Sequence, residues 1–448
     1  MRLLVLAVSV CLIFKVHSQA LSTNKRRQFV SLYDYDQQTN PSSENGKTHI
    51  LLQGFTWNAR VGNEEGLWYT HLKSKTDHLK HIGITHVWFP PVSRSVSPQG
   101  YMPGDYYDLG TNTDKTFYGS SKELKAAIDS LREKGIIPIA DVVINHRTAS
   151  HQENGVWNVF HHKSGEMVWE KWALAKDDYG GSGSLDTGEN FEPAPDIDHT
   201  NLVVQQDIIQ WLGWLIHEIG FEGFRFDYVK GYSGQFVQRY LSATQPSFAV
   251  GEYWSSMDYT DQFVLKPNQN AHRQEIVNWV DSAGGLPHTF DFTTKGILQE
   301  ALLREELWRL KDNQNRASGV IGWWPTRSVT FLDNHDTGSQ QAHWPFPEKY
   351  LLAGYAYILT HPGTPCLFWD HLYAREPDVA SQIEEMAMLR HEFKIHSGSQ
   401  LTIMKASSKE YRAHIDNRIY LILGEINSPP PPPWKERMRG ADFAIFTR

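Results

Sequence analysis

Cysteine is almost absent from this sequence of 448 residues, which contains only Cys11 and Cys366. Cys11 falls within an N-terminal segment that we expect to be removed, so the mature chain has no pair of cysteines that could form an internal disulfide. Without a disulfide, the folded protein must be stabilised by the packing of its core, with a bound metal ion as a further source of stability.

Long hydrophobic runs are missing after the first twenty residues. Residues 1–20 (MRLLVLAVSVCLIFKVHSQA) combine a basic residue, an apolar run from Leu3 to Phe14, and small residues at Ser18 and Ala20. This pattern is typical of a secretory signal peptide cleaved near Ala20, and the run is too short to span a bilayer. We therefore expect a secreted, extracellular protein that has no membrane partner.

The sequence also lacks an excess of positive charge, because 43 Lys and Arg residues stand against 51 Asp and Glu residues and leave a net charge of −8. This balance argues against nucleic acid and against an anionic membrane surface as partners. Aromatic residues are abundant, with 16 Trp, 19 Tyr and 21 Phe. Tryptophan in this quantity suits the flat apolar faces of sugar rings, because its N–H remains free to bond hydroxyl groups.

Segments with strand character alternate with helical patterns from residue 49 onward, after a polar stretch at 21–46 that reads as a flexible leader. The strand candidates are 49–55, 85–89, 136–143, 223–227, 248–252, 288–292, 327–333 and 365–369. Eight βα units predict an α/β fold in which a parallel sheet closes into a (β/α)8 TIM barrel. An open doubly wound sheet is the alternative, but no glycine-rich phosphate loop follows the first strand.

Two parts of the chain interrupt this alternation. Residues 144–200 are rich in Gly, Asp, His and Trp and weak in helical period, which is typical of an inserted, loop-rich domain with a function. After residue 395, short strands predict a small antiparallel β domain, and the proline-rich stretch SPPPPP at 428–433 interrupts it. The expected division is a signal peptide at 1–20, a leader at 21–46, a catalytic barrel at 47–143 and 201–395, an inserted domain at 144–200, and an atypical C-terminal β domain at 396–448.

Residues 223–231 (GFRFDYVKG) place charge inside a strand pattern. Arg225 and Asp227 alternate with phenylalanines, so both charged side chains lie on one face of the strand, within reach of each other. Charge in a buried strand is costly unless it is paired or useful. A structural ion pair and a functional site are both consistent with this stretch by itself.

Polar side chains also gather at the ends of other predicted strands, which is where barrel enzymes carry their chemistry. The strand-end residues are Asp141, Asn145 and His146 at the end of the third strand, Glu252 at the end of the fifth, and His335 and Asp336 at the end of the seventh. A single carboxylate in such a place is usually a helix cap or a salt bridge. Three carboxylates with attendant His and Arg on separate strands of one barrel point to catalysis instead.

Glycoside hydrolysis has a use for such a set, because it needs one carboxylate as nucleophile and one carboxylic acid to protonate the leaving oxygen. Arg225 is expected to hold Asp227 ionised, which suits the nucleophile. Glu252 is followed by two aromatic residues, Tyr253 and Trp254, so we expect a drier site and a raised pKa, which suits the acid. The groups that then bond the sugar hydroxyls and stabilise the oxocarbenium-like transition state are Asp336, His335 and His146.

Four segments in this order and spacing, DVVINH, GFRFDYVKG, GEYW and FLDNHD, resemble the signature segments of the α-amylase family of retaining glycoside hydrolases. GYMPGDYYDLG, APDIDH, DFTTKGIL, GWWP, NHDTGS and YAYILTHPGTPCLF further resemble plant-type α-amylases. The resemblance implies endo-hydrolysis of α-1,4-glucosidic bonds in starch and maltooligosaccharides by a retaining double displacement. We expect the protein to be a monomer.

The resemblance also implies roles for individual residues. Asp227 would be the nucleophile, Glu252 the general acid/base and Asp336 the stabiliser of the transition state. These roles agree with those argued above from the residues themselves. The substrate-binding residues that the resemblance implies are Tyr101, His146, Arg225, Lys230, His335 and Trp254.

The inserted segment at 144–200 resembles domain B of that family, which holds calcium. The matching ligand positions are Asn145, Asp186 and Asp196, with backbone oxygens from Glu189 and Gly231. Carboxylate, amide and carbonyl oxygens are the hard ligands that Ca²⁺ selects, so the resemblance implies Ca²⁺ as a cofactor. An ordinary acidic loop is the alternative.

Two further segments bear on carbohydrate binding. Trp323 and Trp324 match a pair that forms a surface platform for starch in plant-type relatives, so we predict a surface carbohydrate site there. The C-terminal stretch EINSPPPPPWKERMRGADFAIFTR departs from the family, and the β domain looks shortened or replaced at this point.

Two other functions are alternatives to an α-amylase. Another α-glucan-active member of the family, a transglycosylase or a debranching enzyme, is the nearest alternative. A non-catalytic starch-binding relative is the alternative from a different class. Such proteins usually lack a catalytic carboxylate, whereas all three are present here.

Overall fold

The computed structural model describes residues 46–338 and 340–448. The predicted signal peptide, 1–20, and all but the last residue of the predicted leader, 21–46, lie outside the described residues. Within the described part of the chain, no helix has the length and apolar character needed to cross a membrane.

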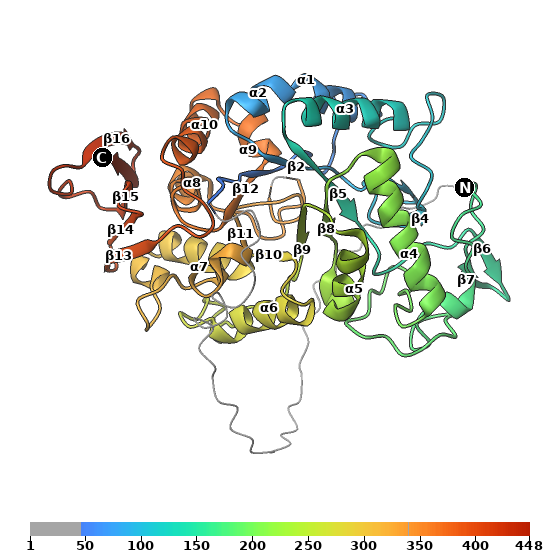
Figure 1. Cartoon of the computed structure of the whole chain (residues 1–448). Helices are drawn as coiled ribbons and strands as arrows, with labels where there is room; N and C mark the ends of the chain where they lie inside the picture. Colours follow the sequence, from blue (N-terminus) through green and yellow to red (C-terminus); the bar gives the residue numbers. More distant parts are fainter. Residues whose placement is uncertain (1–45, 339) are drawn as a thin grey trace, which may run out of the picture. The chain divides into compact units, whose positions relative to one another are not determined.

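Eight parallel strands close into a barrel (Figure 1). The strands are β1 (Leu51–Gln53), β2 (His86–Trp88), β5 (Ile137–Val142), β8 (Gly223–Phe226), β9 (Phe248–Gly251), β10 (His288–Phe290), β11 (Ser328–Phe331) and β12 (Thr364–Phe368), each paired with the next and β12 with β1. The predicted (β/α)8 barrel is confirmed. Seven strands lie within the predicted segments, and β12 begins one residue earlier.

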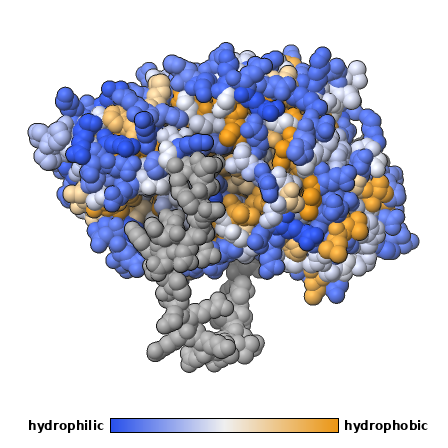
Figure 2. Space-filling model, viewed as in Figure 1, coloured by the Kyte–Doolittle hydropathy of each residue, from blue (hydrophilic) through white to orange (hydrophobic). Residues whose placement is uncertain are grey.

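Helices form the layer around the barrel (Figure 1). They are α1 (Trp68–Ser74), α2 (Thr76–His81), α3 (Ser121–Glu133), α4 (Leu202–Trp214), α5 (Gly234–Thr244), α6 (Asn270–Ser282), α7 (Phe292–Leu303), α8 (Leu351–Thr360), α9 (Trp369–Tyr373) and α10 (Pro377–Glu392). Helix α4 buries Ile208, Trp211 and Leu212 on one face, while Val203 is 54% exposed. This one-sided burial is what an amphipathic spacing of apolar residues produces. The outward faces are mostly hydrophilic on the side shown in Figure 2.

The connection from β5 to α4 is the inserted segment that the sequence predicts. It contains a hairpin of β6 (His151–Glu153) and β7 (Val156–Val159), and loops make up most of the remainder. Arg147 ties it to the connection between β2 and α3, because its buried guanidinium donates to the carbonyl oxygens of Gly104 in that connection (2.9 Å) and of Met167 in the inserted segment (2.7 Å). The same guanidinium lies over three rings, those of Tyr106, Phe160 and Trp169.

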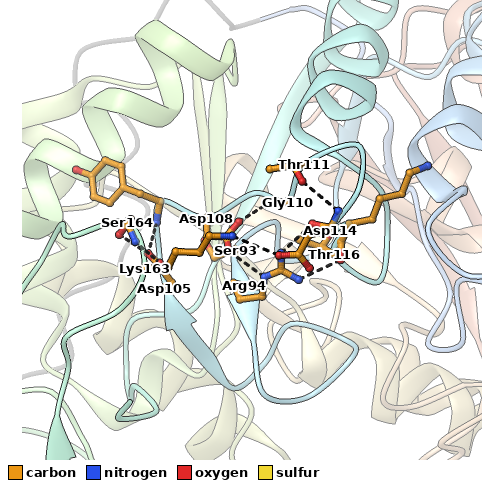
Figure 3. Close-up of polar contacts among 12 residues, drawn as sticks. Ser93, Arg94, Asp105, Asp108, Gly110, Thr111, Asp114, Thr116, Lys163 and Ser164 are labelled. Atoms are coloured by element: carbon orange, nitrogen blue, oxygen red, sulfur yellow. Dashed lines mark hydrogen bonds and ion pairs between the residues drawn. The ribbon is translucent and has the colours of Figure 1, made fainter. Parts of the chain in front are cut away.

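A short antiparallel ribbon, β3 (Arg94–Ser95) with β4 (Pro103–Asp105), holds the loop that carries Tyr101. Figure 3 shows how this ribbon is braced on both sides. The Nε of Arg94 donates to Asp108 at 3.0 Å, and Asp105 accepts a 2.6 Å hydrogen bond from the hydroxyl of Ser164 in the inserted segment. The loop is therefore braced within its own connection and is also fixed to the inserted segment.

A five-stranded antiparallel sheet ends the chain. Its strands are β13 (Leu401–Ala406), β14 (Glu410–Ile415), β15 (Ile419–Gly424), β16 (Lys435–Arg439) and β17 (Phe443–Thr447), in the spatial order β13-β14-β15-β17-β16. The proline run does not break the sheet, because it lies in the connection between β15 and β16. Tyr411 joins the sheet to the barrel layer, since its hydroxyl lies 2.8 Å from Nε2 of His361, directly after α8.

Candidate active site

Arg225 lies among three acidic side chains at the carboxyl ends of barrel strands. Its Nη1 lies 2.9 Å from Oδ1 of Asp141 and 2.6 Å from Oδ1 of Asp227, and its Nη2 lies 2.6 Å from Oε2 of Glu252. Arg225 is completely buried, and none of the three carboxylate residues is more than 8% exposed. The sequence suggested that Arg225 serves Asp227, but the closed barrel brings Glu252 equally near. One guanidinium therefore positions both proposed catalytic carboxylates.

Strand register explains this convergence. Asp141 on β5 is directly paired with Arg225 on β8. The backbone N–H of Asp227 donates to the carbonyl of Val142, and that of Glu252 donates to the carbonyl of Phe226, both at 3.0 Å. Because these backbone hydrogen bonds also close the barrel, the spacing of the carboxylates is set by the fold and not by flexible loops.

Burial raises the pKa values of the carboxyl groups of Glu252, Asp141 and Asp336 above those of exposed carboxyl groups. Burial raises the pKa of Glu252 well above the usual range of a carboxyl group, and the nearby Asp227 and Asp336 raise it further, whereas Arg225 acts in the opposite direction. Burial also raises the pKa values of Asp141 and Asp336. A glutamate that stays protonated near neutral pH is suited to act as a general acid. The drier site expected for Glu252 is thus found.

Asp336 and His335 approach this cluster from the loop after β11. Nε2 of His335 lies 3.3 Å from Oδ2 of Asp336, and its Nδ1 lies 3.2 Å from Nε2 of Gln53. The side chain of Asp336 is 26% exposed, and Gln341 donates to its other oxygen. Asp336 is therefore held in place and still open to a ligand.

Stacked rings form a wall next to the carboxylates. Trp57 and Tyr101 lie nearly parallel with ring centroids 6.1 Å apart, and Tyr101 stacks on His335 at 4.9 Å. His146 donates from Nε2 to the carbonyl oxygen of Tyr101 at 2.8 Å and stacks on Phe191 at 3.8 Å. Flat apolar faces beside hydrogen-bonding groups suit a sugar ring.

A cleft of about 740 Å³ opens over these groups. Its lining includes all three predicted catalytic residues and five of the six predicted substrate-binding residues, namely Tyr101, His146, Lys230, His335 and Trp254. Arg225, the sixth, does not line the cleft, because it is buried among the carboxylates. Lys230 also lies 2.9 Å from a carboxylate oxygen of Glu189, and Trp254 stacks on Phe292 at 5.2 Å.

Sequence reasoning assigned no role to several residues of this site. Asp141 accepts hydrogen bonds from the indole of Trp88 (2.9 Å) and the hydroxyl of Tyr101 (2.8 Å), and its position at a strand end was a signal that could have placed it here. Trp57 gave the same signal after the first strand. Phe191 gave none, because it lies in an inserted loop without periodicity.

A buried charge network stands behind the cleft wall at Trp344. Lys295 on α7 is completely buried, with its Nζ 3.4 Å from Oδ1 of Asp333 and 4.7 Å from the ring centroid of Trp344. Burial lowers the pKa of Lys295 to about 8. Nε2 of His371 lies 3.4 Å from the other oxygen of Asp333. This network fixes the loop that carries Asp336.

The predicted calcium ligands lie together beside the cleft. Nδ2 of Asn145 donates to Oδ1 of Asp196 at 2.7 Å, while Oδ1 of Asn145 is buried with no hydrogen-bond partner among the described residues. That oxygen would lie 2.0 Å from a Cβ at Gly231, so the Gly231 backbone lies directly against it. The backbone N–H of Glu189 donates to the carbonyl oxygen of Lys230 at 3.0 Å, which brings the Glu189 segment to the same place.

Two carboxylates complete this group of oxygens. Oδ2 of Asp186 is buried without a partner among the described residues. Burial raises the pKa of Asp196 to about 8, with Asp186 and Asp178 adding to the rise. In the described ranges no three His, Cys, Asp or Glu side chains form a metal-binding group, and the predicted set contributes only two carboxylate side chains. The remaining oxygens would come from an amide and from the backbone, as Ca²⁺ accepts.

The predicted surface platform of Trp323 and Trp324 is not found in that form. Trp324 is only 5% exposed. The guanidinium of Arg273 lies 3.6 Å from the ring centroid of Trp323 and so covers one of its faces. The loop turns these rings toward the protein, and the pair does not offer two open faces to a polysaccharide.

Comparison with known proteins agrees with this geometry. The alpha-amylase catalytic domain family matches residues 58–344, and the alpha-amylase C-terminal beta-sheet domain family matches residues 392–447. Alpha-amylase 3, chloroplastic, of Arabidopsis thaliana is 43% identical over 403 residues, which are 89% of this chain and 44% of that protein. Probable alpha-amylase 2 of Arabidopsis thaliana is 41% identical over 399 residues, covering 89% of this chain and 93% of that protein.

Solved structures show the same fold. The crystal structure of CldA, a cyclomaltodextrin glucanotransferase, has a TM-score of 0.63 at 16% identity and covers 84% of this chain and 87% of that one. The chain spans less than half of the first Arabidopsis relative but nearly all of the second. Because the catalytic-domain family matches more than half of the chain and both relatives exceed 40% identity, the chain belongs to the α-amylase family of glycoside hydrolases.

Proposed function

We propose that this protein is an endo-acting α-amylase that hydrolyses α-1,4-glucosidic bonds in starch and maltooligosaccharides with retention of configuration. The observation that supports this most strongly is the sharing of Arg225 by Asp227 and Glu252 beneath the cleft. A cleft of about 740 Å³ with a stacked aromatic wall suits a chain of several sugars.

The proposed steps follow from the surroundings of each carboxyl group. Asp227 is held by an arginine and attacks the anomeric carbon, while Glu252, with its raised pKa, protonates the leaving oxygen. The glycosyl–Asp227 intermediate is then hydrolysed by a water that Glu252 deprotonates. Asp336 and His335 contact the sugar and stabilise positive charge on the ring in the transition state.

A transglycosylase that acts on the same α-glucans is the nearest alternative, and the fold of this chain is shared with a glucanotransferase. The fold by itself does not separate the two, since function lies in the site. Incubation of the purified protein with amylose separates them. We expect shorter linear maltooligosaccharides, whereas cyclic or longer products would favour the alternative.

The stereochemistry of the product provides a direct test of the double displacement. Attack by Asp227 inverts the α configuration once, and attack by water inverts it again, so the first products should be α-anomers. Retaining enzymes place the two carboxyl groups about 5–5.5 Å apart, and bonding to one guanidinium is compatible with such a spacing. Proton NMR of the products, recorded before mutarotation, measures the outcome. A β-anomer would exclude Asp227 as the nucleophile.

We further propose that Ca²⁺ binds between the inserted segment and the barrel. Asn145, Asp186 and Asp196 would contribute side-chain oxygens, and Glu189 and Gly231 would contribute backbone oxygens. The buried oxygens of Asn145 and Asp186 that have no partner among the described residues support this proposal, because unpaired buried acceptors are costly without a cation. Bound Ca²⁺ would supply the positive charge that these oxygens need and would join the inserted segment to the barrel.

Removal of calcium is expected to lower the melting temperature. A ligand that binds only the folded protein stabilises it by about 2.7 kcal/mol at a hundredfold excess over Kd. Differential scanning fluorimetry with and without a chelator measures the shift, and Asp196→Ala should lower the melting temperature in the presence of calcium. Glu189→Gln serves as the control, because only its backbone oxygen is assigned to the site. Identical melting curves with and without chelator would contradict the proposal.

We also propose that residues 1–20 direct secretion, that the domains divide as the sequence predicts, and that the protein acts as a monomer. The short apolar run supports secretion, and the single long insertion supports the division into domains. The negative net charge supports a monomer, because like charges keep copies of a protein apart. Mass spectrometry of secreted protein would test the cleavage near Ala20 directly.

A further inference from the structure

A second groove runs between α3 and the end of α4, two helices that Figure 1 shows on the same side of the barrel. It consists of two hollows of about 710 and 470 Å³ that share Lys125, Asp129 and Ile219. None of the residues that line these hollows lines the catalytic cleft. The groove is therefore a separate feature of the surface.

Two aromatic rings form one end of this groove. Tyr107 follows β4, and Trp214 is the last residue of α4. Both are partly exposed, and their ring centroids lie 4.8 Å apart at an angle of 49°. Such a pair gives a sugar two apolar surfaces at an angle, and Thr111 and Ser121 add hydroxyl groups to the same lining.

Hydrogen bonds and an ion pair hold the loop beside Tyr107 in place (Figure 3). Arg94 donates to Oδ2 of Asp108 at 3.0 Å, and Oδ1 of Asp108 accepts from the N–H of Gly110 at 2.8 Å. Thr111 Oγ1 accepts from the N–H of Asp114 at 3.0 Å. A lining that is already held in place loses little conformational freedom when a ligand binds.

The other wall contains an uncommon backbone element. Residues Leu215–Ile219 form a π-helix that continues α4, and the chain leaves it at Gly220 with a φ of +100°. This element provides Ile216, His217 and Glu218 to the second hollow. π-Helical turns are rare and concentrate at functional sites, which is an independent indication that the groove has a role.

The charges along the groove indicate what kind of ligand it takes. The cationic lining residues are Lys122, Lys125 and Arg132, and the anionic ones are Asp108, Asp129, Glu218 and Glu222. Arg132 and Glu222 neutralise each other at 3.0 Å. This near balance suits a neutral ligand with many hydroxyl groups better than a phosphate or a nucleic acid, which needs a basic surface.

We propose that the groove between α3 and α4 is a second, non-catalytic site that binds an α-glucan chain. The inference rests on the proposed function, because it assumes that the substrate is a polymer long enough to reach both sites. When one glucan chain binds to both sites of the protein, the effective concentration of substrate at the catalytic cleft rises. The groove then matters most for long or insoluble glucans.

Isothermal titration of maltoheptaose into the catalytically impaired Asp227→Asn protein tests this inference. We expect two maltoheptaose sites per protein molecule, and one site when Trp214→Ala is added to Asp227→Asn. Trp157→Ala is the matched control, because Trp157 is 53% exposed on β7 and does not line the groove, so it should leave two sites. Ala126→Arg, which fills the groove from α3 without removing a packed ring, should also leave one.

The possible results separate the two proposals. One site in Asp227→Asn, unaffected by Trp214→Ala or Ala126→Arg, would overturn the second site and leave the proposed function standing. No binding at all, together with no hydrolysis of starch by the wild-type protein, would overturn both. In the wild-type background, Trp214→Ala should reduce the rate on granular starch about tenfold relative to its rate on maltoheptaose, as expected when one of two linked sites is lost.

Discussion

Glu252→Gln is expected to reduce starch hydrolysis by about 10²- to 10⁴-fold, the usual cost of losing a general acid. Asp227→Asn is expected to reduce it by at least as much, because it removes the nucleophile. The glutamine side chain would keep the shape of Glu252 but could not transfer a proton to the leaving oxygen. The asparagine side chain in place of Asp227 could not attack the anomeric carbon. The initial rate of reducing-end release from soluble starch measures both effects.

Structure should be largely kept in both variants, because each amide retains a carbonyl oxygen that Arg225 can contact. Circular dichroism and a melting curve verify this. Glu275→Gln is the control, since Glu275 lies on the exposed side of α6 and, among the residues that the structure describes, accepts a hydrogen bond only from Ser255. If Glu252→Gln or Asp227→Asn kept more than about a tenth of wild-type activity with a normal melting curve, its catalytic role would be excluded.

Arg225→Met should lose both activity and stability. Removing one partner of a buried ion pair typically costs about 3–5 kcal/mol, because the charge left behind has no compensation, and here three carboxylates are left. Activity should fall by about 10²-fold or more, because Asp227 and Glu252 lose their common support. Chemical denaturation and the rate on soluble starch measure the two effects.

The pH dependence of this variant has a definite sign. Burial already raises the pKa values of Asp141 and Glu252, so both groups take up protons more readily in the folded protein than in the unfolded chain. Stability from such groups is present at low pH and is lost as pH rises through the raised values. The loss of stability in Arg225→Met should therefore be smallest in acid and should grow toward alkaline pH.

Arg273→Met is the matched control for this experiment. Arg273 is equally buried and lies 3.1 Å from Asp312, but neither residue lines the cleft. We expect a loss of stability that is smaller, because one carboxylate and not three loses its partner, and a rate on starch close to that of the wild type. A loss of activity as large as in Arg225→Met would show that instability, and not the position of the carboxylates, explains both variants.

The barrel was predictable because its strands are short, apolar and regularly separated by helices, and because carboxyl ends of parallel strands meet on one side. That rule was sufficient to bring Asp227, Glu252 and Asp336 together. It was not sufficient to show that Arg225 contacts Glu252, since sequence distance says nothing about which neighbours a closed barrel places face to face.

Residues in irregular segments were harder to place. Trp324 shows the limit, because the exposure of a loop side chain depends on how the loop packs, and here it turns inward. Phe191 shows the converse, since it reaches the cleft from a segment without periodicity. The proline run was expected to disrupt the last sheet, but a connection between strands tolerates proline because its backbone need not donate hydrogen bonds.

The single cysteine in the described part of the chain has a practical consequence. Cys366 lies on β12 and is only 2% exposed, and burial raises the pKa of its thiol. Reagents that react with thiolates will therefore not modify it, because its sulfur is inaccessible and remains protonated. A protein produced without residues 1–20 therefore needs no cysteine to be removed before one is added. A cysteine introduced at the exposed position of Lys122 or Lys125 would take up a fluorophore selectively and would report from solution whether a glucan enters the groove.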